Sequence, residues 1–219
     1  MTALRSKYKI YGRTKGRKKK RYNLDQTFVN NIITKDINIK IKDNNILDIG
    51  SGSGENSIYQ SMKFPKSKII ACETFLDGNI NLCYKIFKKN LNNISVYNGN
   101  VLELFDTIRK KNIFDSIWIL FPDPWPKKKH HKRRLISKAL IKNFEYILAP
   151  KGQIYLSTDS SEYLKIIFEN FFCNNNFIWI NKKPGECFIR PKILTRTKYE
   201  NKADLNLNKK YFLKFKKKS

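Results

Sequence analysis

The stretch from Ser116 to Arg134 combines residue types that could do chemistry on a polyanion. It begins with a short apolar run, 117–121, that is typical of a buried strand. Pro122 and Pro124 then stiffen the chain around Asp123 at the carboxyl end of that strand. Eight residues without an acid follow: Lys127, Lys128, Lys129, His130, His131, Lys132, Arg133 and Arg134. The alternative interpretation is a proline-rich loop before a solvated basic helix start.

A second group of residues, earlier in the chain, has the types expected around a cationic ligand. Asp48 lies in the end of a predicted strand, and Gly50, Gly52 and Gly54 form the turn after it, where glycine lets a backbone approach a ligand closely. The acid after Gly54 takes the place of the third glycine of a dinucleotide-binding turn. Glu73 ends the next strand, where a carboxylate can accept hydrogen bonds from ribose hydroxyls. S-adenosylmethionine has a sulfonium, an ammonium and no phosphate, so we predict it as cofactor, with a nicotinamide nucleotide as the alternative.

Three further side chains have two interpretations each. Asn100 follows the third predicted strand, where its amide could pair with adenine or cap the next helix. Asp159 could contact the substrate or cap the helix beginning near Ser160. Trp125 could be an exposed platform or a packed lid, whereas Trp118 is predicted to lie in the core.

The elements that must position these residues alternate between strands and helices. Strands are predicted at 45–50, 68–73, 94–97, 117–121, 153–157, 177–180 and from about 209, with helices between them and a weak one at 24–39. This alternation is typical of βαβ units and a mostly parallel sheet with helices on both faces. Ligands bind such sheets at the carboxyl ends of the strands, where these acids fall. The stretch 184–200 lacks periodicity and is the expected functional loop.

Length and charge favour a single domain that binds a polyanion. The chain has 219 residues and a formal net charge of +27. Residues 1–23 are predicted to be a flexible basic arm, and residues 24–219 a single domain. Nucleic acid is the expected partner, with an acidic membrane surface as the weaker alternative. The four cysteines stand far apart without a C-x-x-C pair, which argues against a zinc site, and the absence of a hydrophobic leader argues against disulfides. No window approaches the roughly 18 apolar residues of a membrane span. We therefore expect a reduced cytoplasmic protein without a metal.

Several motifs together resemble one family. DIGSGSG at 48–54, Glu73, FPDPWPKKKHHKRR at 121–134, STDS at 157–160 and TRTKYE at 195–200 are similar, in this order, to the bacterial tRNA (guanine-N7-)-methyltransferases. The resemblance covers about residues 45–215. It implies a Rossmann-like class I methyltransferase fold with a seven-stranded sheet, and methyl transfer from S-adenosylmethionine to N7 of guanosine 46 in the variable loop of tRNA.

The resemblance also implies roles for individual residues. Asp123 is the implied catalytic residue, and the cofactor would contact Asp48, Gly50, Gly52, Gly54, Glu73, Asn100 and Asp123. tRNA would contact Lys127, Lys129, His130, His131, Lys132, Arg133, Arg134, Asp159, Thr197, Lys198, Tyr199 and Glu200. The family often has Glu where Asp48 stands and Asp where Asn100 stands. We expect a monomer or weak homodimer; a non-catalytic RNA-binding module and a methyltransferase for another substrate are the competing functions.

Overall fold

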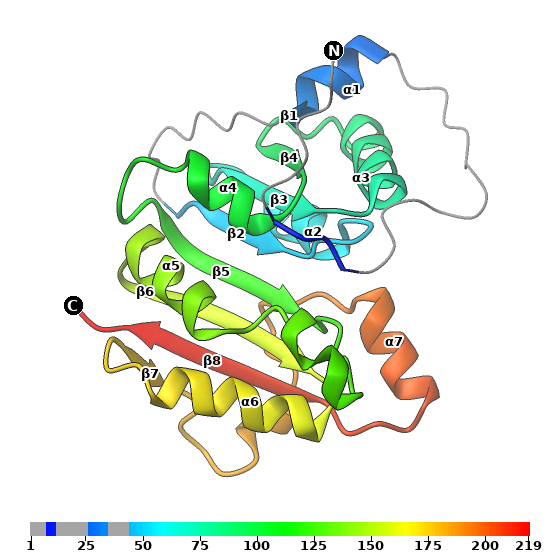
Figure 1. The fold of residues 1–219 in the computed structure, drawn as a ribbon. Coiled ribbons are helices and arrows are strands. Elements are labelled where there is room, and N and C mark those ends of the chain that lie inside the picture. Colours follow the sequence, from blue (N-terminus) through cyan, green and yellow to red (C-terminus); the bar gives the residue numbers. More distant parts are fainter. Residues whose placement is uncertain (1–7, 12–25, 35–43) are drawn as a thin grey trace.

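The computed structural model describes residues 8–11, 26–34 and 44–219, which form one sheet flanked by helices (Figure 1). The strands are β1 (Ile33–Thr34), β2 (Ile46–Ile49), β3 (Ile69–Glu73), β4 (Ile94–Asn98), β5 (Phe114–Leu120), β6 (Leu148–Thr158), β7 (Phe177–Trp179) and β8 (Tyr211–Lys217). The helices are α1 (Gln26–Ile32), α2 (Glu55–Lys63), α3 (Leu76–Lys88), α4 (Val101–Thr107), α5 (Lys138–Ile147), α6 (Ser161–Phe172) and α7 (Lys198–Leu205). Two short 3-10 helices, η1 (Lys128–Arg133) and η2 (Glu186–Phe188), complete the described elements.

The strand order places a ligand-binding crevice at the centre of the sheet. The order is β1-β4-β3-β2-β5-β6-β8-β7, and only β8 runs antiparallel to its neighbours among the described strands. From β2 the chain builds outward through β3 and β4, then returns to place β5 on the other side of β2. The carboxyl ends of β2 and β5 therefore lie side by side at the topological switch point.

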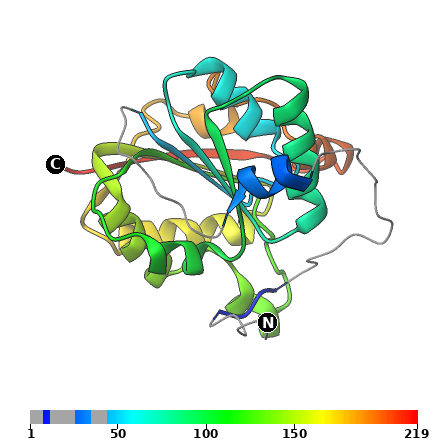
Figure 2. The same ribbon diagram turned by 90° about the horizontal axis from the view of Figure 1, so that it is seen from above.

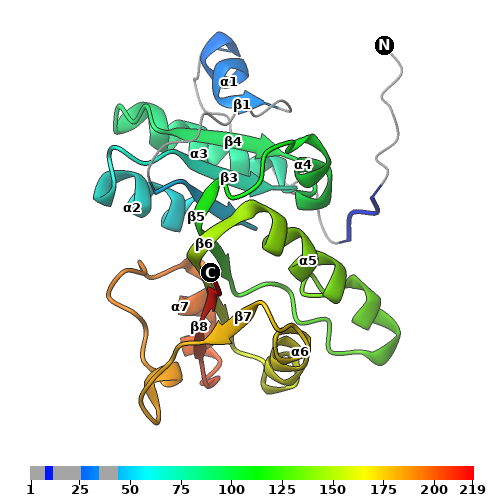
Figure 3. The ribbon, with the colours of Figure 1, turned by 90° about the vertical axis from the view of Figure 1, so that its left-hand side faces the viewer.

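Two clusters of buried side chains hold helices on the two faces of the sheet. The first joins α4, α5 and α6 to one face and includes Phe114, Phe144 and Phe171. The second lies against α2 and α3 on the other face and includes Trp118, which stacks on Tyr155 with ring centroids 3.9 Å apart. Figures 2 and 3 show the helices on both sides of the twisted sheet. The core interpretation of Trp118 is confirmed.

The predicted architecture is confirmed, with differences at three places. Seven of the strands match the predicted mostly parallel sheet, and the two-residue β1 adds an eighth strand at its edge. The helix expected after the strand at 117–121 does not begin in the basic stretch but only after Ser137, whose hydroxyl accepts a hydrogen bond from the Leu140 amide (3.3 Å). The stretch 184–200, expected as a loop, contains η2 and the first turn of α7. Most of the predicted arm at 1–23 lies outside the described residues.

Candidate active site

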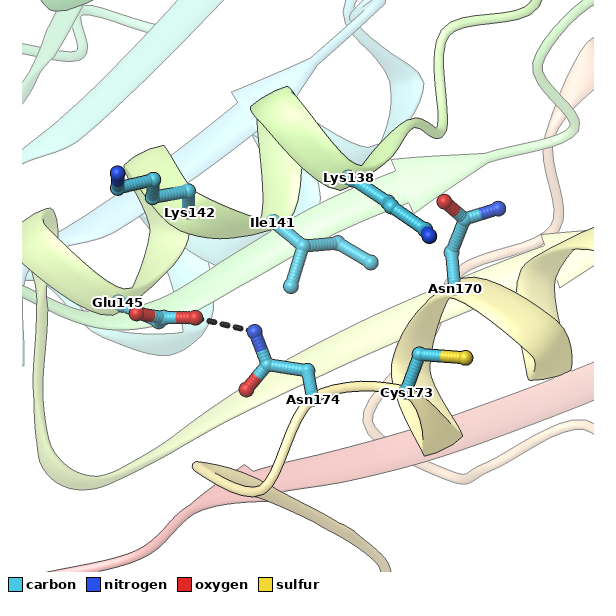
Figure 4. Close-up of a pocket in the computed structure, with 7 residues that line it drawn as sticks. All are labelled: Lys138, Ile141, Lys142, Glu145, Asn170, Cys173 and Asn174. Carbon is cyan, nitrogen blue, oxygen red and sulfur yellow. Dashed lines mark hydrogen bonds between the residues drawn. The ribbon is translucent and has the colours of Figure 1, made fainter.

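A cavity of about 710 Å³ opens at the carboxyl ends of the central strands. Five of the seven predicted cofactor-contacting residues line it: Gly50, Gly52, Glu73, Asn100 and Asp123. They come from the ends of β2, β3, β4 and β5, so the parallel sheet brings together residues that are up to 73 positions apart in the chain. A further hollow of about 330 Å³ between α5 and α6 contains none of them (Figure 4).

The glycine turn, residues 50–54, has a backbone that only glycine adopts easily. The φ angles of Gly50, Gly52 and Gly54 are +71°, +57° and +78°. A Cβ on Gly54 would lie 2.3 Å from Leu82 Cδ1 of α3. A Cβ on Gly78 would lie 2.5 Å from the carbonyl oxygen of Gly52. The start of α3 therefore packs directly against the turn, and Gly78 is a requirement that the sequence motif did not reveal.

Glu73 is fixed by backbone amides at the edge of the cavity. Its Oε2 accepts a hydrogen bond from the Gly52 amide (2.9 Å), and its Oε1 accepts from the amides of Thr74 (2.6 Å) and Phe75 (2.9 Å). Gly52 is the single donor to Oε2 among the described residues, so this oxygen can accept a further hydrogen bond. The carboxylate is therefore preorganised to receive a hydroxyl from a ligand.

Asp48 lies beneath the glycine turn, where we expected it to face a cationic ligand. It is buried, does not line the cavity, and accepts a hydrogen bond from the Ser57 hydroxyl of α2 (2.6 Å). Burial raises the pKa of Asp48 to about 6, although the hydrogen bond from Ser57 opposes this shift. In the structure Asp48 thus connects β2 to α2 below the turn.

Asn100 caps α4 and faces the cavity at the same time. Its Oδ1 accepts a hydrogen bond from the Leu102 amide (3.0 Å), and Glu103 completes a capping box with the Asn100 amide (3.3 Å). The predicted cap is confirmed. The oxygen is used by the helix, which leaves the Nδ2 amide as the group available to a ligand.

The proline turn, residues 121–125, presents Asp123 at the opposite side of the cavity. Phe121 and Trp125, on either side of the two prolines, have φ angles of +52° and +43°. Such angles are costly for bulky residues and cluster at functional sites. Asp123 is exposed, and among the described residues none donates a hydrogen bond to its carboxylate.

Comparison with known proteins identifies the family. A family model described as a putative methyltransferase matches residues 42–213. The tRNA (guanine-N(7)-)-methyltransferase of Buchnera aphidicola subsp. Schizaphis graminum is 33% identical over 78% of this chain and 71% of its own length. That of Nitrosococcus oceani is 32% identical over 78% and 70%. The chain belongs to the tRNA (guanine-N(7)-)-methyltransferase family.

Solved structures support the fold alone, because their sequences are distant. A 16S rRNA methyltransferase aligns with a TM-score of 0.58 at 10% identity over 82% of this chain and 90% of that one. Precorrin-6y C5,15-methyltransferase from Geobacter metallireducens aligns with a TM-score of 0.54 at 17% identity, covering 81% of each chain. The predicted class I methyltransferase fold is confirmed.

The basic stretch, residues 127–134, forms an exposed 3-10 turn in this family member. Lys127, Lys129 and Lys132 are exposed. His131 Nε2 lies 3.1 Å from a Glu162 carboxylate oxygen. Partial desolvation and the charges of the neighbouring cations lower the pKa of His130. The structure thus presents several cations beside the proline turn, and no group of metal-ligating side chains occurs within the described ranges.

Two aromatic rings hold Arg133 beside the cavity. Its guanidinium lies 4.9 Å from the centre of the Trp125 ring and 5.5 Å from that of Tyr11. Trp125 is half-buried, and its ring meets His130 edge to face. Residues 9–11 also line the cavity, and the Tyr8 hydroxyl donates to the Asp106 carboxylate (3.1 Å). Part of the predicted arm therefore lines the cavity, which its basic composition alone could not indicate.

Arg134 differs from the rest of the basic stretch because its side chain is buried. Only 4% of it is exposed, whereas we expected an RNA contact. Its Nε donates to the Pro124 carbonyl (2.8 Å), and its Nη2 donates to Glu162 (2.8 Å) and to the Trp125 carbonyl (3.4 Å). The guanidinium is thus bound to the proline turn and not presented on the surface.

The T-K-Y-E segment, residues 197–200, has two buried and two exposed members. Thr197 is the N-cap of α7, accepting from the Glu200 amide (3.1 Å). Glu200 is buried, with Arg190 and Lys210 at 3.4 and 3.7 Å from its Oε1. Lys198 and Tyr199 line the cavity. Tyr199 is about half exposed, and partial desolvation, followed by the charges of Glu73 and Asp123, raises the pKa of its hydroxyl.

Asp159 stands apart from the cavity lining. Asn208 Nδ2 donates to its carboxylate (2.9 Å). Ser160, not Asp159, caps α6 by accepting from the Tyr163 amide (3.2 Å). The capping interpretation of Asp159 is therefore wrong, and its contact with guanine stays a prediction.

None of the described helices is long and apolar enough to cross a membrane.

Proposed function

We propose that this chain transfers a methyl group from S-adenosylmethionine to N7 of a guanosine in tRNA, at position 46 of the variable loop. The observation that carries the proposal is a single cavity lined by two carboxylates with different hydrogen-bonding surroundings. Glu73 is fixed by backbone amides on the glycine-turn side, and Asp123 is exposed without a described donor on the other side. Two ligands with different hydrogen-bonding needs fit such a cavity.

The residues on the glycine-turn side fit S-adenosylmethionine. The open acceptor of Glu73 suits a ribose hydroxyl, the Asn100 Nδ2 suits the adenine edge, and the glycines leave room for the rest of the ligand. When bound, the cofactor supplies a methyl group already activated by its sulfonium. Asp48, buried below, contributes by holding β2 and α2 under the turn.

No residue is required to act as a general base. N7 of guanine has a free lone pair and carries no proton, so nothing has to be deprotonated before it attacks the methyl carbon. The protein must hold the reacting atoms in line, which can contribute about 7–11 kcal/mol. Asp123 suits this task, because its carboxylate can accept hydrogen bonds from guanine N1–H and the exocyclic amine and stabilise the developing positive charge of the purine.

The cations around the cavity suit the tRNA backbone. Lys127, Lys129 and Lys132 are exposed in the segment that follows the proline turn, and Arg133 and Lys198 line the cavity itself. Tyr199 lines the cavity, which supports a contact with guanine, and the contacts of Thr197 and Glu200 hold the segment that contains it. His130, His131 and Asp159 complete the proposed tRNA contacts. As its substrate is tRNA, we place the enzyme in the cytoplasm.

The test is methylation of a tRNA transcript with labelled S-adenosylmethionine, followed by strand cleavage at 7-methylguanosine. We expect one labelled product, cut at position 46. The controls are a transcript with adenosine at that position and the Asp123→Ala variant, both of which should accept little label. Label on another atom or base would overturn the reaction assignment. Binding of tRNA without transfer would support the non-catalytic RNA-binding module instead.

A further inference from the structure

Arg134 is the buried member of a basic stretch whose other residues are exposed or half-buried. Its guanidinium is enclosed by three acceptors, the carbonyls of Pro124 and Trp125 and the carboxylate of Glu162, at 2.8, 3.4 and 2.8 Å. It also lies over the Tyr163 ring, 5.4 Å from its centre. Because only 4% of the side chain is exposed, a phosphate could not reach the guanidinium unless the groups around it rearranged.

The carbonyls of the proline turn need a donor from elsewhere in the chain, such as Arg134, because the turn has few N–H groups of its own. Pro122 and Pro124 have no N–H, so the turn offers carbonyls but few groups to pair them with. Phe121 and Trp125 also have the positive φ angles given above, and such angles persist only where surrounding contacts enforce them. The Phe121 amide is held by the Ser157 carbonyl of β6 (2.9 Å), which secures the start of the turn. Arg134 binds the carbonyls of Pro124 and Trp125 at the end of the turn, and Asp123 lies between these two points of attachment.

Arg134 is connected to the core through its contacts with the first turn of α6. Glu162 and Tyr163 are adjacent there, and Tyr163 is fully buried with its hydroxyl accepting from the Ile136 amide (3.0 Å). Ile167 and Phe171 fix the same helix to the sheet. Lysine could not replace this contact, because its single ammonium lacks the planar fork that reaches two carbonyls and a carboxylate at once.

We propose that Arg134 is a positioning residue that holds the proline turn, and with it Asp123, in the conformation needed for methyl transfer, and that it is not an RNA contact. The proposal rests on the proposed function, because its kinetic consequence is a slower transfer step. It divides the basic stretch by role: exposed lysines set tRNA affinity, and the buried arginine sets the rate.

The test compares Arg134→Lys with Lys132→Ala in the full chain, measuring the single-turnover rate at saturating tRNA and cofactor and the salt dependence of tRNA affinity. Arg134→Lys should lower the rate on the order of 100-fold, the scale of a misplacement by about 1 Å, and leave the salt slope unchanged. Lys132→Ala should lower the log–log salt slope by about 0.7–0.9, the effect of removing one phosphate contact. A flatter slope with a wild-type rate in Arg134→Lys would overturn the proposal.

Two further measurements keep the proposal testable if Arg134→Lys folds poorly or if tRNA is not methylated. Glu162→Ala removes an acceptor of Arg134 without removing a cation, so a slower rate at unchanged or tighter tRNA binding supports positioning, and a wild-type rate contradicts it. Fluorotryptophan NMR reads the turn directly, because Trp125 is one of three tryptophans. Its resonance should move in Arg134→Lys and not in Lys132→Ala, whatever the substrate is; no movement in either variant would overturn the proposal.

Discussion

The glycine turn after β2 and the proline turn after β5 place left-handed backbone at the ends of two adjacent strands by different means. In the glycine turn, the three residues with positive φ are glycines, which adopt this conformation at little cost. In the proline turn they are Phe121 and Trp125, and the conformation depends on contacts from β6 and from Arg134. The first turn is specified locally, whereas the second is specified by residues elsewhere in the chain.

The acids beside the two turns differ in the same way. Asp48 is buried under the glycine turn against Ser57, and Asp123 is exposed in the proline turn. A stiff turn that leaves its acid unpaired is suited to a ligand, while a buried acid mainly affects the free energy of unfolding. Changing each acid should therefore affect different properties.

The largest effect is expected at Asp123. Asp123→Ala should lower the single-turnover methyl-transfer rate about 10²–10³-fold, or about 3–4 kcal/mol, because a preorganised charge is lost. Asp123→Asn should lose less, since the amide keeps one acceptor. The melting temperature of both variants should match wild type because the side chain is exposed. Equal rates for Ala and Asn would contradict the role given to the acceptor.

The second effect concerns Asp48 and pH. Its folded pKa, about 6, is above its ordinary value of 3.8, so protons bind more tightly to the folded chain. The free energy of unfolding should therefore fall as pH rises from about 4 to 6, by about 3 kcal/mol, and the loss should persist above pH 6. Asp48→Asn should lack this decrease and be more stable than wild type at pH 7, as measured by denaturant unfolding without cofactor. A variant less stable at pH 7 would show that the buried charge is fully compensated.

A smaller effect separates two glycines of the same turn. Gly54→Ala should lower the free energy of unfolding by about 2–3 kcal/mol, because it adds both backbone strain and a contact with Leu82. Gly50→Ala should cost only about 1 kcal/mol, since no atom lies within 4 Å of its Cβ position. Chemical denaturation of both variants checks the difference. Similar losses in the two variants would mean that backbone strain alone accounts for the lower stability and that the contact with Leu82 adds nothing.

The difference between the turns also explains what the sequence could predict. The alternation of apolar segments predicted the strands, and the glycine spacing together with Glu73 located the glycine-turn side of the cavity. The burial of Arg134 could not be predicted, because in sequence it looks like its basic neighbours and only the packing of α6 distinguishes it.

Two other features depended on contacts distant in sequence. β8 is inserted antiparallel between β6 and β7, which no local pattern indicates. α7 was missed because the stretch before it lacks apolar periodicity, although Thr197 followed by Glu200 three positions later is a helix-start signal that could have located it.

The most direct test of base-free methyl transfer is the pH dependence of the single-turnover rate at saturating tRNA and cofactor. Because N7 needs no deprotonation, we predict a nearly flat rate from the pH at which the carboxylates ionise until guanine N1 begins to titrate. Arg134→Lys and Asp123→Asn should be slower with the same flat profile. An ascending limb near neutrality in the wild type that disappears in Asp123→Asn would show that a titrating base is required and would contradict the mechanism.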